Sequence, residues 1–294
     1  MSNIISFNSL SKEQKEYYEY ELQLTKNLYS YEQEKIDKLK KKQESNKEKL
    51  LSLLLLLIKG IKLNNGYLNI NEGNLNKLMK KINKEIDDIF KNEIIYEKIE
   101  IEKILNEVID FSYDINSYLI SLGDDSYNPT ELSEVIKTKI LNSKIENKTY
   151  KDRIEKNKNK ISDKIKNNIE KFLIGTITLE YLKELLHKNL ETNNFNTERL
   201  TKDQISRKYS SSKEQWAKDN NIKIKIWISI LCDTTCGKCE QRHLKVFDIK
   251  DNSIEIPAHV NCYCYWFYVP LKNYKINKGK MSWKEFLKWE GDDK

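Results

Sequence analysis

The chain has 294 residues, and its 52 basic and 45 acidic residues give a formal net charge of +7. This length allows one or two domains with substantial cores, and the low counts of three prolines and eight glycines favour long helices. Because the two signs of charge are mixed along the chain, the mild excess of basic residues does not by itself indicate a nucleic-acid-binding protein.

Two N-terminal features bear on secretion and membranes. Residues 1–7 lack the basic and apolar regions of a secretory signal, which favours synthesis in the cytoplasm. An apolar run at residues 50–58 is about half the ~20 residues that a membrane-spanning helix needs. We therefore expect no membrane span, and we interpret the run as a buried helix face.

The N-terminal part has the features of long helices. Ser11-Lys-Glu-Gln14 matches a capping box, in which the serine hydroxyl and the glutamine side chain each bind a backbone amide at a helix start. We expect this helix to run to about Lys62 and to end at Asn64-Asn-Gly66. The wholly polar residues 40–49 within it are expected to be solvated or to contact a partner.

Three further signals place helices in the middle of the chain. Apolar residues repeat at helical spacing from 101 to 109 and again from 154 to 172, with Gly175 as the C-cap of the second stretch. Between them, Asn128-Pro129-Thr-Glu131 combines an N-cap with a proline at the first helical position. Residues 1–170 are therefore expected to form an extended α-helical region without evident chemistry.

The pattern changes after Gly175. Thr178 is placed to cap a helix with leucines up to residue 190, and a separate helix fits residues 203–219. Isoleucines alternate with other residues from 222 to 230, which predicts a strand with one buried face.

A second strand and a last helix follow. The aromatic-rich residues 262–269 predict the strand, and Ser282-Trp-Lys-Glu285 predicts the cap of a short terminal helix. The chain is thus expected to be an α+β protein. It would have a predominantly helical N-terminal region and a small C-terminal mixed α/β domain.

Four of the five cysteines and one of the three histidines lie close together in the sequence: Cys236, Cys239, His259, Cys262 and Cys264. A C-x2-C turn places two thiolates on one metal ion, and tetrahedral zinc takes four Cys or His ligands. We expect a structural zinc ion bound by four of these residues, with Cys262 and Cys264 competing for the last position. A full Cys/His set leaves no coordination site for water or substrate.

Cys236 and Cys239 follow the first predicted strand, and Cys262 and Cys264 lie at the start of the second. The ion would therefore join the two strands in a zinc-clasped domain. Two alternatives stay open. The residues could be reduced, buried cysteines, since free cysteine is among the most buried residue types. Disulfides agree less well with an odd cysteine count and no secretory signal.

Around these residues the chain resembles the C-terminal domain of the phage Mu protein F-like, or phage minor head protein, family, which acts in head morphogenesis. The family pattern is a Trp followed two residues later by Ser or Thr, then Thr-Cys-x-x-Cys, a hairpin with a Phe, and Pro-x-His-x-x-Cys-x-Cys. The matching residues are Trp227, Ser229, Thr235, Cys236, Cys239, Phe247, Pro257, His259, Cys262 and Cys264. The resemblance covers roughly residues 165–270, and its joint pattern is specific although no single piece is.

The chain also departs from the family pattern. Cys232 stands where the family usually has Asp, with Asp233 shifted by one position. Leu244 replaces a hairpin glycine, and Tyr263 replaces the Arg between the last two cysteines. These changes leave the metal-binding set intact.

The resemblance implies a non-enzymatic minor virion component near the portal that acts in head assembly or DNA delivery. It would be made in the bacterial host cytoplasm and end in the virion. Its partners would be phage portal, capsid and scaffold proteins, with at most weak, non-specific DNA contact. The chain would then divide into a helical interaction region, residues 1–170, and a head morphogenesis domain with the Cys/His metal site, residues 171–294.

Two other functional classes stay open. His259 and Asn261 beside a Cys-rich site resemble nucleases of the His-Asn-His class, and a metal-dependent nuclease or toxin-like domain would add a base such as Asp233 or Glu240. His243 could replace His259 as a ligand, although a solvated loop histidine is the simpler interpretation. A zinc-dependent DNA-binding regulator is the second class. A zinc finger of that kind has a helix between its ligand pairs, and no helix is predicted between Cys239 and His259.

Overall fold

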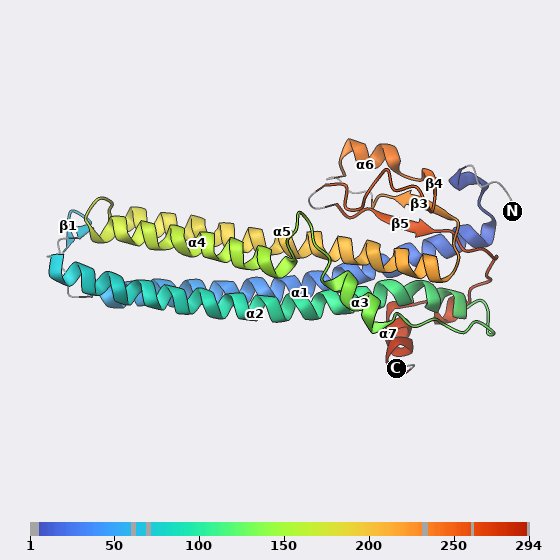
Figure 1. The fold of residues 1–294 in the computed structure, drawn as a ribbon, viewed down its shortest axis with the longest axis horizontal. Helices are drawn as coiled ribbons and strands as arrows, with labels where there is room; N and C mark the ends of the chain where they lie inside the picture. Colours follow the sequence, from blue (N-terminus) through green and yellow to red (C-terminus); the bar gives the residue numbers. More distant parts are fainter. Residues whose placement is uncertain (1–5, 60–62, 69–71, 231–234, 260–261, 293–294) are drawn as a thin grey trace. The chain divides into compact units, whose positions relative to one another are not determined.

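The computed structural model describes residues 6–59, 63–68, 72–230, 235–259 and 262–292. These residues form seven α-helices, two short 3-10 helices and two small antiparallel sheets (Figure 1). The larger sheet consists of strands that begin at Ile224 or later. The expected α+β class, with a helical N-terminal region and a small mixed C-terminal part, is therefore confirmed.

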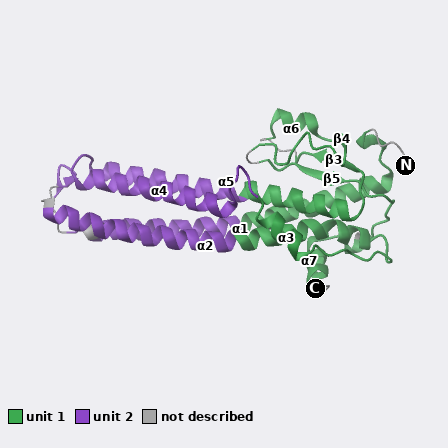
Figure 2. Ribbon diagram, viewed as in Figure 1, with its two compact units in different colours: residues 1–34, 102–143, 202–294 green, residues 35–101, 144–201 purple. Residues whose placement is uncertain are grey.

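The chain divides into two compact units, and neither is continuous in sequence (Figure 2). Unit 1 comprises Met1–Glu34, Glu102–Ser143 and Lys202–Lys294, and unit 2 comprises Lys35–Ile101 and Lys144–Thr201. α1 (Lys12–Ile58), α2 (Glu72–Ser121) and α5 (Leu179–Asp219) each contribute residues to both units. The expected boundary at residue 170 falls within α4 (Tyr150–Leu173) of unit 2, and a functional division there stays a prediction.

Unit 2 is a bundle of four helical segments, taken from α1, α2, α4 and α5. Each segment places an apolar stripe in the common core, as helical periodicity requires. Leu50 and Leu54 of the apolar run are buried as expected, whereas Leu55 and Leu56 are exposed. The core residues include Leu50, Leu54, Ile82, Ile86, Phe90, Ile161, Ile165, Ile169, Phe172, Leu182, Leu186 and Leu190.

A hairpin of β1 (Leu63–Asn64) and β2 (Tyr67–Leu68) stands where the sequence predicted only the end of a helix. Asn65 and Gly66 have φ angles of 51° and 84°, the combination that a two-residue Asn-Gly hairpin turn requires. The Gly66 carbonyl accepts a hydrogen bond from Leu179 N at 2.9 Å. α1 ends at Ile58, and the predicted helix end near Lys62 lies outside the described residues.

Several predicted helix ends are confirmed. At the start of α1, Ser11 Oγ accepts from Gln14 N at 3.1 Å and Gln14 Oε1 accepts from Ser11 N at 3.0 Å. α4 ends shortly before Gly175, whose φ of 76° is the left-handed conformation of a glycine C-cap. At the start of α7 (Trp283–Asp292), Ser282 Oγ accepts from Glu285 N at 3.1 Å.

The helix predicted to begin at Pro129 is wrong. α3 (Glu134–Leu141) begins five residues later, and its N-cap is Ser133, whose Oγ accepts from Ile136 N at 3.4 Å. Thr130, which would lie in the first turn of the predicted helix, instead hydrogen-bonds through Oγ1 to the Tyr113 hydroxyl at 3.0 Å. A tertiary contact therefore competes with the local start signal at the proline.

The two helices predicted on either side of residue 200 are one. α5 begins after Thr178, whose Oγ1 accepts from Tyr181 N at 3.2 Å, and continues without a break to Asp219. No glycine or proline interrupts residues 179–219, so nothing in the backbone requires a second start.

Unit 1 contains the larger sheet, in the strand order β4–β3–β5. β3 (Ile224–Ile228) pairs antiparallel with β4 (Val246–Asp248) and with β5 (Tyr265–Tyr268). The expectation of one buried face is wrong, because Lys225 and Ile226 of β3 are both buried. Lys225 Nζ lies 4.6 Å from the centre of the Trp266 ring and donates to the Asp251 carbonyl at 2.6 Å, so its charged end keeps polar partners.

Aromatic side chains from helices cover β5. The Tyr18 ring of α1 meets Phe267 edge-on at a centroid distance of 5.3 Å, and the Tyr209 ring of α5 meets Tyr265 at 6.0 Å. These contacts fix the strand that precedes the terminal helix α7. Among the described residues, no helix has the length and apolar character that crossing a membrane requires.

Phe172→Ala should lower the free energy of unfolding by about 3–5 kcal/mol, because the ring is fully buried in the unit 2 core. Ile174→Ala is the matched control, since Ile174 is 52% exposed and its truncation should cost less than about 0.5 kcal/mol. Urea denaturation followed by circular dichroism compares the two variants. Equal losses of stability would contradict this assignment of the core.

Candidate metal centre

The first two cysteines lie at the start of a short helix. Cys236 is the N-cap of α6 (Gly237–Arg242), and its Sγ accepts a hydrogen bond from Cys239 N at 3.4 Å. The C-x2-C spacing thus places Cys239 in the first helical turn, with its thiol beside that of the capping residue. This local geometry needs no residue from elsewhere in the chain.

His259 completes a first group of three. Its Nε2 lies 3.2 Å from Cys236 Sγ and 3.2 Å from Cys239 Sγ, and Cys239 Sγ lies 3.9 Å from Cys262 Sγ. Two ligands of one tetrahedral zinc ion lie about 3.5–3.8 Å apart, given Zn–S and Zn–N distances of about 2.3 and 2.0 Å. The observed separations are close to that requirement.

The five predicted residues form two overlapping groups that share Cys239. Cys236, Cys239 and His259 make one group, and Cys239, Cys262 and Cys264 make the other, with the ligand atoms of each group within 4.8 Å of one another. The four cysteines are free thiols. The structure therefore brings together all five predicted ligands, in an arrangement compatible with a metal site.

The thiols differ in how readily they lose a proton. A hydrogen bond from the Cys264 thiol lowers the pKa of Cys262 to about 5, and the same interaction raises the pKa of Cys264 above its ordinary value. The backbone N–H of Cys239 lowers the pKa of Cys236. Burial raises the pKa of Cys239 to about 12. Metal binding by these cysteines would release the protons that their thiols still carry.

Ser229, just beyond β3, connects the strand to the cysteines. Its Oγ donates to the Cys239 carbonyl at 2.6 Å, and it accepts from Trp227 Nε1 at 3.1 Å and from the Cys264 thiol at 3.5 Å. The sequence pattern Trp-x-Ser does not by itself indicate a role for the hydroxyl. The structure shows that both side chains of the pattern belong to the support of the cysteine cluster.

His243 and Leu244 follow α6 and complete this support. His243 Nδ1 accepts from Ser229 N at 3.2 Å, and burial lowers the pKa of the imidazole. His243 belongs to neither ligand group, so the geometry does not support the alternative in which His243 replaces His259 as a ligand. Leu244 has a φ of 63°, a left-handed conformation in which glycine is favoured, which explains why a glycine suits this hairpin position.

The residues suggested as catalytic bases are placed as follows. Glu240 is exposed on α6 and belongs to neither ligand group, while Asp233, Asn261 and the fifth cysteine, Cys232, lie outside the described residues. Among the described residues, the two ligand groups consist of cysteine and histidine only.

Compared with family models, curated proteins and solved structures, the chain matches none. The resemblance to the phage minor head family therefore stays a prediction that depends on the quoted residues. The geometry of the cluster and the chemistry of its side chains are the basis for a functional proposal.

Ser229→Ala should lower the stability of unit 1 by about 1–3 kcal/mol, because it leaves the buried Cys239 carbonyl and the Trp227 indole without their partner. The change in tryptophan fluorescence during urea denaturation would measure the loss. Ser229→Cys restores a weak hydrogen-bonding group and should recover part of it. Full stability of the alanine variant would show that the hydroxyl does not support the site.

Proposed function

We propose that Cys236, Cys239, His259 and Cys262 bind one structural zinc ion. The observation that supports this proposal is the set of 3.2, 3.2 and 3.9 Å separations, which approach the edge lengths of a tetrahedral site. Cys264 is assigned a supporting role, because its thiol is hydrogen-bonded to Ser229 Oγ at 3.5 Å. Bound zinc would join the segment after β3 to the segment before β5.

A structural role agrees with the ligand chemistry. Four Cys and His ligands close a tetrahedral zinc site, whereas hydrolytic zinc sites keep one position for water and place a base nearby. The carboxylate of Glu240 is exposed and outside both ligand groups. We therefore favour a non-enzymatic protein over a metal-dependent nuclease.

At the level of biology, we propose a phage minor head protein that acts in head morphogenesis. The support is the order of matching residues, from Trp227 and Ser229 to Cys262 and Cys264, together with the roles of these side chains around one cluster. The helical segments would provide surfaces for portal, capsid or scaffold proteins. The protein would be made in the host cytoplasm and incorporated into the virion.

Purified protein should contain about one zinc ion per chain, as measured by elemental mass spectrometry with thiol titration. Cys262→Ser should lose most of this zinc, whereas the matched variant Cys264→Ser should keep it, because only the first removes a proposed ligand. Zinc absent from folded wild-type protein would contradict the metal assignment. The reverse behaviour of the two variants would instead exchange the roles of Cys262 and Cys264.

The functional proposal predicts no nucleic-acid cleavage by the purified protein with zinc, magnesium or manganese. DNA binding should be weak at low ionic strength and should disappear near physiological salt, because contacts with phosphates depend strongly on salt. If cleavage is observed and is lost in His259→Ala but kept in His243→Ala, the protein is a nuclease. In that event the structural proposal is wrong.

Incorporation into particles is the direct test of the head proposal. Antibodies against the chain should detect it in purified virions and should co-precipitate the portal protein from assembling heads. Point variants suit this test better than deletion of residues 1–150, since that deletion would remove residues from the cores of both units. Virions that lack the chain, and heads that form normally without it, would exclude the proposal.

A further inference from the structure

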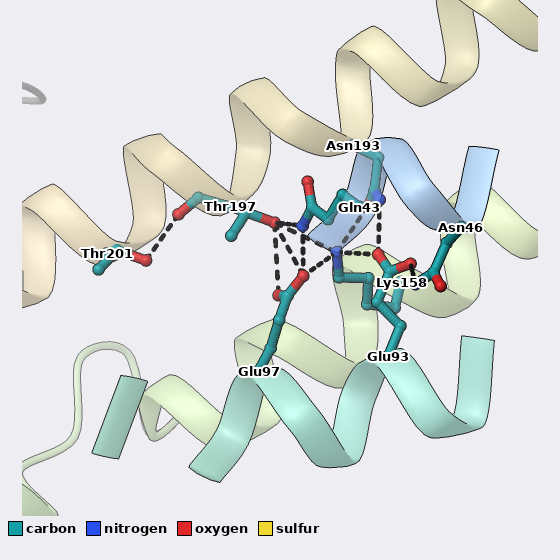
Figure 3. Close-up of polar contacts among 8 residues, drawn as sticks. All are labelled: Gln43, Asn46, Glu93, Glu97, Lys158, Asn193, Thr197 and Thr201. Atoms are coloured by element: carbon teal, nitrogen blue, oxygen red, sulfur yellow. Dashed lines mark hydrogen bonds and ion pairs between the residues drawn. The ribbon is translucent and has the colours of Figure 1, made fainter. Parts of the chain in front are cut away.

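A cluster of polar side chains is buried inside the bundle of unit 2, in a region where the sequence predicted no chemistry. Four helices contribute to it (Figure 3). Its members are Gln43 and Asn46 of α1, Glu93 and Glu97 of α2, Lys158 of α4, and Asn193, Thr197 and Thr201 of α5. The expectation that the polar residues 40–49 are all solvated or partner-bound is therefore wrong for Gln43, which is 3% exposed.

Three of these side chains carry formal charge in the absence of bulk water. Lys158 is 1% exposed, Glu93 is 4% and Glu97 is 2%, and Lys158 Nζ forms ion pairs with both carboxylates. Removing such groups from water costs several kcal/mol per ion, which apolar residues of similar size would avoid. The geometry around the lysine gives a chemical reason for the cluster.

Lys158, Asn193 and Glu93 form a closed triangle of contacts. Lys158 Nζ lies 2.8 Å from Asn193 Oδ1 and 2.5 Å from Glu93 Oε1, and Asn193 Nδ2 donates to the same Glu93 oxygen at 2.7 Å. An amine is thus held against a carboxamide, and one carboxylate oxygen contacts both nitrogen atoms. If the lysine amine replaces the amide nitrogen of the carboxamide, a residue must carry protons between the two nitrogen atoms, and it must contact both of them as Glu93 does.

We propose that Lys158 and Asn193 are joined by an intramolecular isopeptide bond whose formation is catalysed by Glu93. The cross-link would connect α4 to α5 inside unit 2. Asn193 is itself 2% exposed, so the reacting groups are shielded from water, which would otherwise compete as a nucleophile.

The reaction requires no oxidant, reductant or additional substrate. Glu93 takes a proton from the Lys158 ammonium group, and the resulting amine attacks Cγ of Asn193, forming the Nζ–Cγ bond. The tetrahedral intermediate collapses with cleavage of the Cγ–Nδ2 bond, and Nδ2 leaves as ammonia. Of the two protons that Nζ loses, one departs with the ammonia and the other stays on Glu93.

The product also removes buried charge. A neutral amide replaces the lysine ammonium group, and a protonated Glu93 replaces a carboxylate, so two formal charges disappear from the core. Burial raises the pKa of Glu97, which means that the surroundings favour the neutral form of a buried carboxyl group over the charged form. Two other cluster members position this second carboxylate, since Gln43 Nε2 and Thr197 Oγ1 both donate to Glu97.

Glu97 provides a matched control for Glu93. Both glutamates lie on α2 one helical turn apart, both are buried and both pair with Lys158. Glu93 is the one that also accepts from Asn193 Nδ2, at 2.7 Å. If Glu93 catalyses the reaction, Glu93→Gln and Glu97→Gln should differ in whether the cross-link forms. A general role of both glutamates in packing predicts no such difference.

The test is the intact mass of the denatured, reduced full-length protein. The wild-type chain should be lighter than its sequence mass by one ammonia, and protease digestion should give a branched peptide containing Lys158 and Asn193. Glu97→Gln should keep the loss of ammonia, whereas Glu93→Gln and Asn193→Ala should have their full sequence masses. Fragment ions of the branched peptide exclude ammonia loss at any other asparagine.

Folded wild-type protein of full sequence mass would overturn the proposal and would leave the cluster as an ion-pair layer within the bundle. A cross-link that persists in Glu93→Gln would overturn the assigned role of Glu93. The wild-type mass decides the existence of the bond even if a variant fails to fold. None of these measurements involves zinc or phage particles, so their outcome is separate from that of the proposed function.

Discussion

The antiparallel pairing of β3 with β5 determines where the Cys/His cluster forms. Their register places Ile228 opposite Tyr265, so the segment that leaves β3 and the segment that enters β5 meet at one end of the sheet. Cys236 and Cys239 belong to the first segment, and Cys262 and Cys264 to the second. Ser229 links them at the same end of the strand. The sheet, held by aromatic packing, therefore supplies the long-range part of the site.

Both units bury a lysine with a carboxylate, but they surround the pair differently. In unit 1, Lys213 pairs with Glu21, and its Nζ lies 5.0 Å from the Tyr265 ring and 5.4 Å from the Tyr209 ring. Burial lowers the pKa of Lys213 and raises that of Glu21. In unit 2 the pair of Lys158 and Glu93 lies among amide and hydroxyl groups instead. Aromatic faces stabilise a cation without offering it a reactive carbonyl, whereas a carboxamide offers one.

Local signals in the sequence predicted much of the fold and part of the Cys/His cluster. The capping box at Ser11, the serine cap at Ser282, the apolar stripes and the C-x2-C turn each depend on residues within a few positions, and the structure has them where they were expected. The failures have tertiary causes. Thr130 bonds to Tyr113 in place of a helical turn, and Lys225 is covered although it has the charge of an exposed strand residue.

The buried polar cluster escaped prediction for a related reason. Gln43 stands in a run of charged and polar residues, and nothing local distinguishes a polar side chain that faces solvent from one that meets Glu97 across a bundle. The sequence likewise predicted five candidate ligands but did not indicate which of their side chains lie closest to one another. That information comes from distances between side chains remote in sequence, such as 3.9 Å from Cys239 Sγ to Cys262 Sγ.

The interleaved units have a consequence for the order of folding during synthesis. The residues of unit 2 end at Thr201, whereas unit 1 needs Lys202–Lys294 in addition to two earlier segments. Since chains emerge from the ribosome at about 5–20 residues per second, the bundle of unit 2 can close before the strands of unit 1 exist. His259 and Cys262 are made later still, so the proposed zinc ion would bind only at the last stage of folding. Newly made chains would expose the aromatic residues of α1 until that stage, which makes the interval before completion the period of greatest exposure to aggregation.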